Sequence, residues 1–246
     1  MNYHNNILKD FYNNGFTSYK IKKKQIAFIK NLKFEIKKKF KKFFAEDKFE
    51  NFHKHNRFEG INNTRMRIIN YINTRKKLKM DIYLALKPFL DTIIGPDVVV
   101  QKNVNLSIQM PFDDERPLLH KDTPLSSMHE LVIWIPLVNC KDDMCMSMIP
   151  KNKHDIIDSL FKENDEALFE KYAKKYGVRR NIKVGNVLIF NANNFHYIPL
   201  NTTKFTRWSL NIRFKNLFTQ YGQRNLLDYY EIINTSPLTK MNSYQQ

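Results

Sequence analysis

The chain has 246 residues, of which 42% are hydrophobic and 13% aromatic, and its formal net charge at pH 7 is +17. This composition is typical of a globular protein with a substantial core and argues against an intrinsically disordered chain. With only two cysteines, Cys140 and Cys145, neither a disulfide framework nor a cysteine-rich zinc site is expected.

The first 95 residues predict helices. An apolar stripe at helical spacing, with lysines on the other face, runs through Ile29, Leu32, Ile36, Phe40 and Phe43. A second apolar stripe covers residues 82–93 and ends at Gly95-Pro96. Because Pro88 lies inside this second stripe, a kink or a break in the helix is expected there.

After these helices the apolar period changes from 3.6 to 2, which predicts strands. Residues 104–110 alternate apolar and polar side chains, as in a strand with one buried face. Further strands are expected at Leu118–Asp122, Glu130–Asn139, Cys145–Ile149, Asn181–Phe190, His196–Leu200 and Thr206–Phe214. One helix, Asp155–Tyr176, interrupts them and ends at Gly177. Many short strands separated by turns predict a sandwich, a jelly roll or a barrel.

His120 and Asp122 are spaced to bind one metal ion together if they lie in a strand. Residues i and i+2 of a strand point to the same face, so the imidazole and the carboxylate would converge. Taken alone this pair is a weak indication, because the chain has seven histidines and a His-x-Asp sequence often arises by chance.

Residues further along the chain make a metal site more specific. His196 follows the turn and apolar strand of residues 185–190. It completes a set of two histidines and one carboxylate, which leaves half of an octahedral iron open for a bidentate co-substrate and dioxygen. One face of the next predicted strand would carry Arg207, Ser209, Asn211 and Arg213. Burying that face without a ligand would be costly, and an anionic co-substrate held by a planar guanidinium supplies the reason.

This order of motifs resembles the 2-oxoglutarate/iron(II) dioxygenase superfamily. The eleven-residue spacing from His196 to Arg207 is similar to the phytanoyl-CoA dioxygenase-like branch. Residues 120–137 further resemble oxygenases of bacterial carbohydrate-biosynthesis clusters, including the streptomycin-pathway type. The resemblance covers residues 103–215 and includes neither the N-terminal helices nor the C-terminal tail.

The resemblance implies a mostly β core with the double-stranded β-helix fold, a distorted jelly roll of the cupin-like kind. The ligands of iron(II) would be His120, Asp122 and His196. 2-Oxoglutarate would pair with Arg207, helped by Ser209, while Gln109 either contacts the co-substrate or packs against polar neighbours. Dioxygen and a small molecule, sugar-linked or phosphorylated, would be the other substrates. Asp122 implies hydroxylation or a related oxidation, because related halogenases carry a small residue at that position.

The predicted organisation has three parts. Residues 1–95 form a helical region that packs on the barrel, residues 96–218 form the catalytic core, and residues 219–246 form a tail. The apolar stripes of the helices need a partner surface, and the outer face of the larger sheet would offer Trp208, Leu210, Ile212 and Phe214. The helical insertion at residues 155–176 either shapes the substrate pocket or packs outside the barrel.

Two other functions remain as alternatives. The charge of +17 and lysine clusters such as Lys37-Lys38-Lys39 are compatible with a non-catalytic nucleic-acid-binding protein on a β scaffold. The chain has no recognised nucleic-acid motif, however, and its aromatics do not alternate with the basic runs, so these lysines are interpreted as a solvated helix face. The other alternative is a cupin-like metal protein with a different activity.

The sequence predicts a cytoplasmic protein without a membrane partner. Its first residues lack the apolar stretch of a signal peptide. The longest apolar run, Leu131–Val138, is too short to span a bilayer.

Overall fold

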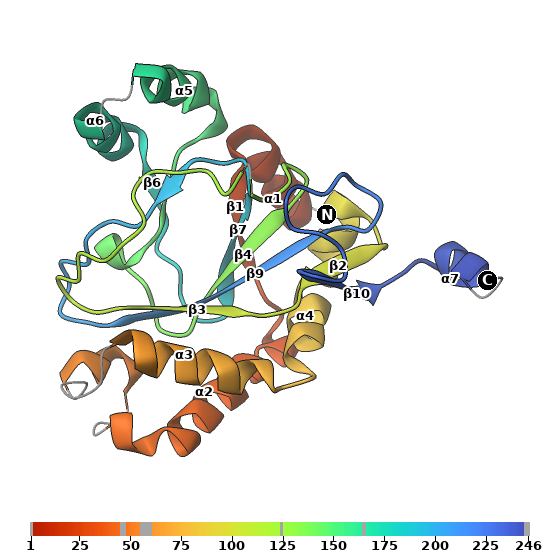
Figure 1. Ribbon diagram of the computed structural model, residues 1–246, viewed down its shortest axis with the longest axis horizontal. Helices are drawn as coiled ribbons and strands as arrows, with labels where there is room; N and C mark the ends of the chain where they lie inside the picture. Colours follow the sequence, from red (N-terminus) through yellow and green to blue (C-terminus); the bar gives the residue numbers. More distant parts are fainter. Residues whose placement is uncertain (1, 45–47, 55–60, 124, 164–165, 244–246) are drawn as a thin grey trace.

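Figure 1 shows the computed structural model of the chain, which describes residues 2–44, 48–54, 61–123, 125–163 and 166–243. Within this part of the chain two antiparallel sheets form the core. The strand order of the large sheet is β1-β7-β4-β9-β2-β10, with β3 also paired to β9, and that of the small sheet is β6-β5-β8. The strands of the large sheet are β1 (Phe16–Lys20), β2 (Val98–Gln101), β3 (Asn105–Gln109), β4 (Leu131–Pro136), β7 (Asn186–Asn191), β9 (Arg207–Asn216) and β10 (Tyr230–Asn234). Those of the small sheet are β5 (Ser147–Met148), β6 (Val178–Arg179) and β8 (His196–Tyr197).

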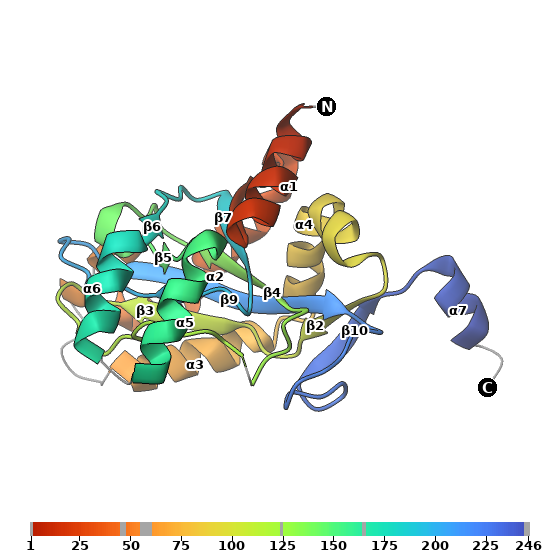
Figure 2. The ribbon, with the colours of Figure 1, turned by 90° about the horizontal axis from the view of Figure 1, so that it is seen from above.

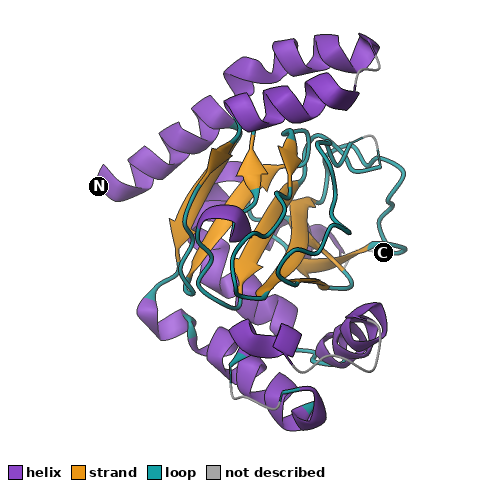
Figure 3. Cartoon of the chain, turned by 90° about the vertical axis from the view of Figure 1, so that its left-hand side faces the viewer, coloured by secondary structure: helices purple, strands orange, loops and turns teal. Residues whose placement is uncertain are grey.

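The helices lie on both sides of this core. The α-helices are α1 (Asn2–Asn14), α2 (Ala27–Lys39), α3 (Ile61–Asn73), α4 (Leu78–Ile94), α5 (His154–Glu163), α6 (Glu166–Tyr176) and α7 (Pro237–Ser243). Short 3₁₀ segments are found at Lys23–Gln25, Lys41–Phe43, Phe49–Lys54, Asp142–Met144 and Lys151–Lys153. Helices α2 and α3 cover one side of the large sheet, whereas α5 and α6 lie beyond the small sheet, and α7 extends away from the body (Figures 1 and 2). The strands are therefore enclosed between helical layers (Figure 3).

The outer face of β9 packs against the N-terminal region. The alternation along β9 directs its apolar residues to one face of the sheet, and all four of them are fully buried: Trp208, Leu210, Ile212 and Phe214. The ring centroids of Phe44, Phe49 and Phe52 lie 5.7, 4.8 and 4.9 Å from that of Trp208. The indole Nε1 also donates a hydrogen bond to the Phe49 carbonyl, at 3.0 Å. The N-terminal aromatics thus support the strand that carries Arg207 on its opposite face.

Removing one of these aromatic rings should destabilise the whole fold. Phe49 is 1% exposed, so Phe49→Ala is expected to lower the free energy of unfolding by about 3–5 kcal/mol through lost burial and the cavity left behind. Phe34→Ala is the matched control, because Phe34 is 66% exposed and its loss should cost less than about 0.5 kcal/mol. Urea denaturation of the two variants measures this difference. Equal midpoints would show that the aromatic cluster does not support the core.

Three strands of the large sheet were not predicted. β1 lies within the first 95 residues and pairs with β7, so the prediction of helices throughout that region is wrong at Phe16–Lys20. β2 is fully buried on both faces and therefore lacks the alternation that marks a half-buried strand. β10 lies in the predicted tail and pairs with β2, so it adds an edge strand to the sheet. Both ends of the chain contribute to the sheet that carries the candidate site.

Helix α4 is continuous through Pro88, so of the kink or break expected there the break does not occur. Proline has no N–H to donate to the carbonyl four residues earlier, which belongs to Leu84. The side-chain amide of Gln25 donates to that carbonyl instead, at 2.8 Å. The helix ends where expected, at Gly95, whose φ of +77° favours glycine.

Other predicted elements are shorter or divided. The predicted strand Leu118–Asp122 is reduced to a single bridge between His120 and His196. The single predicted helix over residues 155–176 is two helices, α5 and α6, and residues 164–165 between them lie outside the described residues. Among the described residues, each helix falls short of the length and hydropathy that a membrane span requires.

Candidate metal and co-substrate site

The structure brings His196 next to His120 and Asp122, although it is distant from them in sequence. One ligand atom from each lies within 4.8 Å of the others. The backbones of the two histidines exchange a pair of hydrogen bonds at 3.0 Å, and the Asp122 N–H donates to the carbonyl of Ala192, also at 3.0 Å. Paired residues in an antiparallel bridge point to the same face, so both imidazoles face the interior between the sheets. Two imidazoles and one carboxylate in this arrangement could hold a divalent metal ion.

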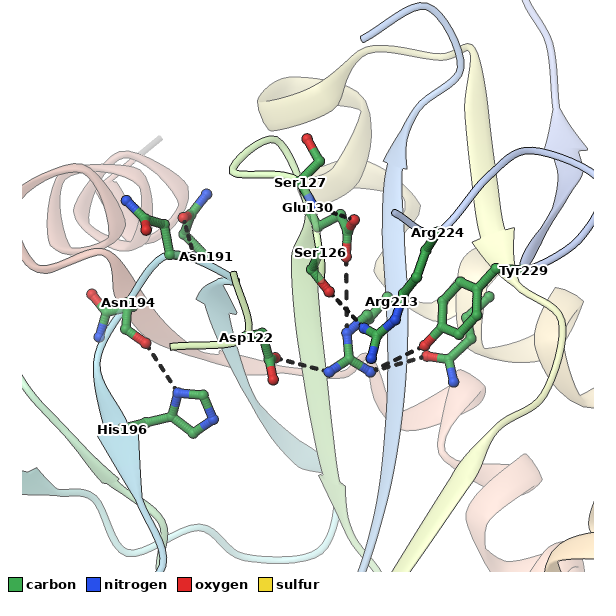
Figure 4. Close-up of polar contacts among 12 residues, drawn as sticks. Asp122, Ser126, Ser127, Glu130, Asn191, Asn194, His196, Arg213, Arg224 and Tyr229 are labelled. Atoms are coloured by element: carbon green, nitrogen blue, oxygen red, sulfur yellow. Dashed lines mark hydrogen bonds and ion pairs between the residues drawn. The ribbon is translucent and has the colours of Figure 1, made fainter. Parts of the chain in front are cut away.

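Both imidazoles are oriented by backbone carbonyls. Nδ1 of His120 lies 2.6 Å from the Leu118 carbonyl oxygen, and Nδ1 of His196 lies 3.0 Å from that of Asn194 (Figure 4). A carbonyl oxygen only accepts, so Nδ1 donates in each ring, and Nε2 is the nitrogen left for a metal ion when the ring is neutral. Such contacts fix the tautomer and the ring orientation that a metal requires.

The electrostatics favour the protonation states that metal ligands need. Burial, and next the neighbouring His120, lower the pKa of His196 to about 4, so its ring is neutral at pH 7. Burial alone would raise the pKa of Asp122, but Arg213 and the two histidines outweigh it and hold the pKa below the ordinary value. A neutral imidazole and an ionised carboxylate are the forms that bind a cation.

Arg207 is buried on the interior face of β9, and part of its guanidinium lacks hydrogen-bond partners among the described residues. The side chain is 1% exposed, and its Nη2 donates to the Ser107 hydroxyl at 3.0 Å. Its Nε and Nη1 have no hydrogen-bond acceptor among the described residues. Burial lowers its pKa to about 10, so the guanidinium is still charged at pH 7. A buried cation with free donors is costly unless an anion binds it, so the residues present fit a carboxylate-bearing co-substrate.

Polar groups around Arg207 are also available to a ligand. β3 and β9 place Gln109 opposite Arg207 and Ser107 opposite Ser209. Nε2 of Gln109 donates to the Pro199 carbonyl at 3.0 Å, but its Oε1 and the Ser209 hydroxyl are buried and have no partner within the part of the chain that the structure describes. The three residues predicted to contact the co-substrate therefore form one cluster.

Arg213 shares the strand face with Arg207 but has a different environment. Its Nη2 donates to Oδ2 of Asp122 at 2.9 Å, and its Nη1 lies 3.4 Å from both Oε1 of Gln101 and the Tyr229 hydroxyl (Figure 4). Although burial alone would lower its pKa, Asp122 and Tyr229 hold that pKa above the ordinary value. The structure thus separates one arginine with free donors from one that is already paired with a carboxylate.

Two further polar groups on the interior face had been given no role from the sequence. Trp134 is part of the buried core, and its Nε1 finds no acceptor among the described residues. It lies opposite Asn211, whose Oδ1 is also unpartnered in the described part of the chain. The uniformly apolar sequence of β4 could not have indicated this, since only the pairing of β4 with β9 places Trp134 beside the polar row.

Helices α5 and α6 pack on the opposite face of the small sheet from the metal-binding triad. Side chains alternate along β8, so His196 faces the interior while Phe195 and Tyr197 face outward. Phe195 and Ile149 form a separate apolar cluster with these helices. A cavity of about 970 Å³ lies beside this cluster, and its lining includes Tyr197 and, from α6, Phe169. The insertion thus packs on the outer face of the small sheet, and α6 also lines a cavity that reaches Leu118 and Leu119, next to His120.

No protein-family model matches the sequence, and no curated protein matches it significantly. The fold, however, is similar to that of several solved structures. A non-heme monooxygenase, ThoJ, solved as a nickel complex, has a TM-score of 0.56 at 13% identity, over 94% of this chain and 84% of its own. SnoK, a non-heme alpha-ketoglutarate-dependent carbocyclase from nogalamycin biosynthesis, has a TM-score of 0.51 at 13% identity, over 89% and 86%. HygX from Streptomyces hygroscopicus, solved with iron bound, has a TM-score of 0.55 at 10% identity, over 91% and 90%. The chain therefore has the fold found in these non-heme enzymes and carries a His-Asp-His triad that could bind iron.

Proposed function

We propose that the protein is an iron(II)- and 2-oxoglutarate-dependent oxygenase of the phytanoyl-CoA dioxygenase-like branch, built on a double-stranded β-helix. The observation that carries this proposal is the buried Arg207 guanidinium, whose Nε and Nη1 have no acceptor among the described residues. It lies on the face of β9 that also carries Arg213, the partner of Asp122 in the His-Asp-His triad. A metal site alone would fit many functions, and so would a buried arginine alone. Together they match a metal ion and an anionic co-substrate bound next to one another.

Each residue would have a defined role. The iron ligands would be His120, Asp122 and His196, and iron with 2-oxoglutarate would supply the oxidising equivalents drawn from dioxygen. Arg207 would bind the remote carboxylate of 2-oxoglutarate through Nε and Nη1, and the Ser209 hydroxyl would donate to the same group. Gln109 would border this pocket. The two sheets would exclude water around the anion and so strengthen these contacts.

The substrate would be a small molecule that is hydroxylated, and we favour a carbohydrate-related metabolite, sugar-linked or phosphorylated. The resemblance of residues 120–137 to oxygenases of carbohydrate-biosynthesis clusters supports this choice, and the basic surface suits a phosphate group. Hydroxylation is favoured because Asp122 keeps a carboxylate in the triad. The carbocyclase SnoK shares the fold, so a related oxidation is the second possible outcome.

The division of labour along the chain is also part of the proposal. Residues 1–95 would support the core rather than form a separable nucleic-acid-binding domain, since the apolar stripes of α2 and α4 are buried in the core shared with the sheet. Residues 96–218 would form the catalytic core, and the remaining residues would complete the sheet through β10.

Succinate formation tests this function directly. Protein loaded with iron(II) under anaerobic conditions and then exposed to air should convert 2-oxoglutarate to succinate slowly without substrate, and faster with an accepted substrate. Protein treated with a chelator is the control. Iron-loaded, folded protein that never forms succinate would contradict the proposal, and specific nucleic-acid binding at physiological salt would favour the alternative.

A further inference from the structure

One carboxylate oxygen of Asp122 is already held by the protein. Nη2 of Arg213 donates to Oδ2 at 2.9 Å, and the Asp122 side chain is 15% exposed while that of Arg213 is 10% exposed (Figure 4). A carboxylate held at one oxygen has its rotamer fixed and keeps its other oxygen for a cation. This contact therefore bears on how Asp122 can bind a metal, apart from any contact with a co-substrate.

The guanidinium of Arg213 is itself fixed from several directions. Gln101 on β2 and the Tyr229 hydroxyl each lie 3.4 Å from its Nη1. Its Nε faces Glu130, whose Oε2 lies 3.9 Å away. Glu130 is 0% exposed, and its Oε1 accepts a hydrogen bond from the Ser127 N–H at 2.7 Å. The hydrogen bonds at both Nη atoms and the ion pair with Glu130 limit the freedom of the guanidinium to turn away from Asp122.

The C-terminal segment, residues 217–234, supplies part of this support. Lys215 at the end of β9 donates to the carbonyls of Thr219 and Gln220, at 3.1 and 2.6 Å, and so fixes the start of the segment. β10 pairs with β2 and fixes its end. Between them, the Arg224 guanidinium lies 4.7 Å from the centre of the Tyr229 ring.

Arg224 also connects this segment to the turn that carries Asp122. Its Nη1 donates to the Ser126 hydroxyl at 2.6 Å (Figure 4). The Ser126 N–H in turn donates to the backbone carbonyl of Asp122 at 3.1 Å. The C-terminal segment thus reaches Asp122 by two routes, through Tyr229 and Arg213 to the carboxylate and through Arg224 and Ser126 to the backbone.

We propose that Arg213 is a positioning residue for Asp122 and that the C-terminal segment holds both in place through Tyr229 and Arg224. This inference rests on the proposed function, because it treats Asp122 as a metal ligand. It assigns the two arginines of β9 to different tasks. Arg207 serves the co-substrate, and Arg213 restrains the carboxylate to one-oxygen binding of the metal. Residues that orient metal ligands typically contribute about 10- to 100-fold to metal affinity.

The test measures metal affinity separately from turnover. Cobalt(II) binding to metal-free full-length protein is followed by calorimetry and by the visible spectrum of the bound ion. Arg213→Gln should weaken cobalt binding about 10- to 100-fold and change the spectrum, because Asp122 can then rotate. Arg213→Lys keeps a charged donor and should recover part of the affinity. At saturating metal, the affinity of Arg213→Gln for 2-oxoglutarate should change less than about threefold. Arg207→Lys should show the reverse pattern, with a weakened affinity for 2-oxoglutarate and a cobalt affinity that is little changed.

Arg180→Gln is the matched control. Arg180 also pairs with an aspartate, Asp10, at 2.8 Å, and this pair has no contact with the triad among the described residues. The cobalt affinity of the Arg180→Gln variant should equal that of the parent protein. Tyr229→Phe and Arg224→Gln test the C-terminal contribution with smaller changes, and each should weaken cobalt binding about 2- to 10-fold.

The outcomes separate this inference from the proposed function. A parent protein that binds no cobalt would reject the proposed function itself. If the parent binds cobalt and a folded Arg213→Gln binds it equally well, the role of Arg213 is rejected. If Arg213→Gln does not fold, the cobalt affinities of Tyr229→Phe and Arg224→Gln provide the test. A cobalt affinity equal to that of the parent in both variants would overturn the inference.

Discussion

Replacing His196 by alanine is expected to abolish stable iron binding while leaving the protein folded. The imidazole is buried, its Nδ1 contacts the Asn194 carbonyl, and its free Nε2 points to the other two members of the triad. Loss of one of three protein ligands should lower iron(II) affinity by at least about 100-fold, because the remaining pair, His120 and Asp122, cannot enclose the metal. Anaerobic equilibrium dialysis with iron(II) gives the affinity of the parent and the variant.

His129→Ala is the control for this experiment, since His129 is exposed and does not belong to the triad. It should keep about one iron per chain, as the parent protein does. Iron binding by His196→Ala at the parental level would show that the ligand assignment is incorrect.

Arg207→Lys should raise the apparent Michaelis constant for 2-oxoglutarate by at least about tenfold. The variant keeps a positive charge but loses the planar pair of donors, Nε and Nη1, that the buried site offers to a carboxylate. A shorter reach from β9 also leaves the Ser107 hydroxyl without its partner. Initial rates of succinate formation at saturating iron, measured over a range of 2-oxoglutarate concentrations, separate this effect from a loss of metal.

The two arginines of β9 make this prediction specific. Arg213 is paired with Asp122, so replacing it should affect metal affinity more than the Michaelis constant. An unchanged constant in Arg207→Lys would mean that another group binds the remote carboxylate. Arg213 would be the next candidate, because it lies on the same face of the strand.

The face assignments along β9 could be predicted from sequence because alternation is a local property. The polar residues Arg207, Ser209 and Arg213 and the apolar residues between them fall on opposite faces in the structure, as the period of two required. The His-x-Asp spacing likewise placed His120 and Asp122 on one side, even though the predicted strand around them is only a bridge.

Partners that depend on contacts distant in sequence could not be predicted in the same way. Nothing local to residues 229–234 shows that β10 pairs with β2 or that Tyr229 contacts Arg213. The side-chain amide of Gln25 donates to the Leu84 carbonyl that Pro88 cannot satisfy in α4, and it lies 59 residues before that carbonyl. Sequence patterns report which face is buried, but not which distant group satisfies a polar atom.

The position of α5 and α6 is a further case of this kind. Their apolar stripes indicated that both helices pack against something, but the outer face of the small sheet and the interior opening were equally compatible with the pattern. The pairing of β5 with β8 places Met148 opposite His196 and Ser147 opposite Tyr197. Met148 belongs to the main hydrophobic core, so His196 shares the inner face and Tyr197 lies on the outer one. The 970 Å³ cavity beside α6 is lined by Tyr197 and also by Leu118 and Leu119, which directly precede His120.

The central claim is that one interior site binds a metal through the triad and 2-oxoglutarate through Arg207. An anaerobic titration tests it most directly, because iron(II) and 2-oxoglutarate bound together give a visible charge-transfer band that neither gives alone. The full-length parent protein should develop this band at about one equivalent of each. Arg207→Lys should require at least about tenfold more 2-oxoglutarate, and His196→Ala should give no band. A parent protein that binds iron but shows no band at any 2-oxoglutarate concentration, or a band that is unchanged in both variants, would contradict the account.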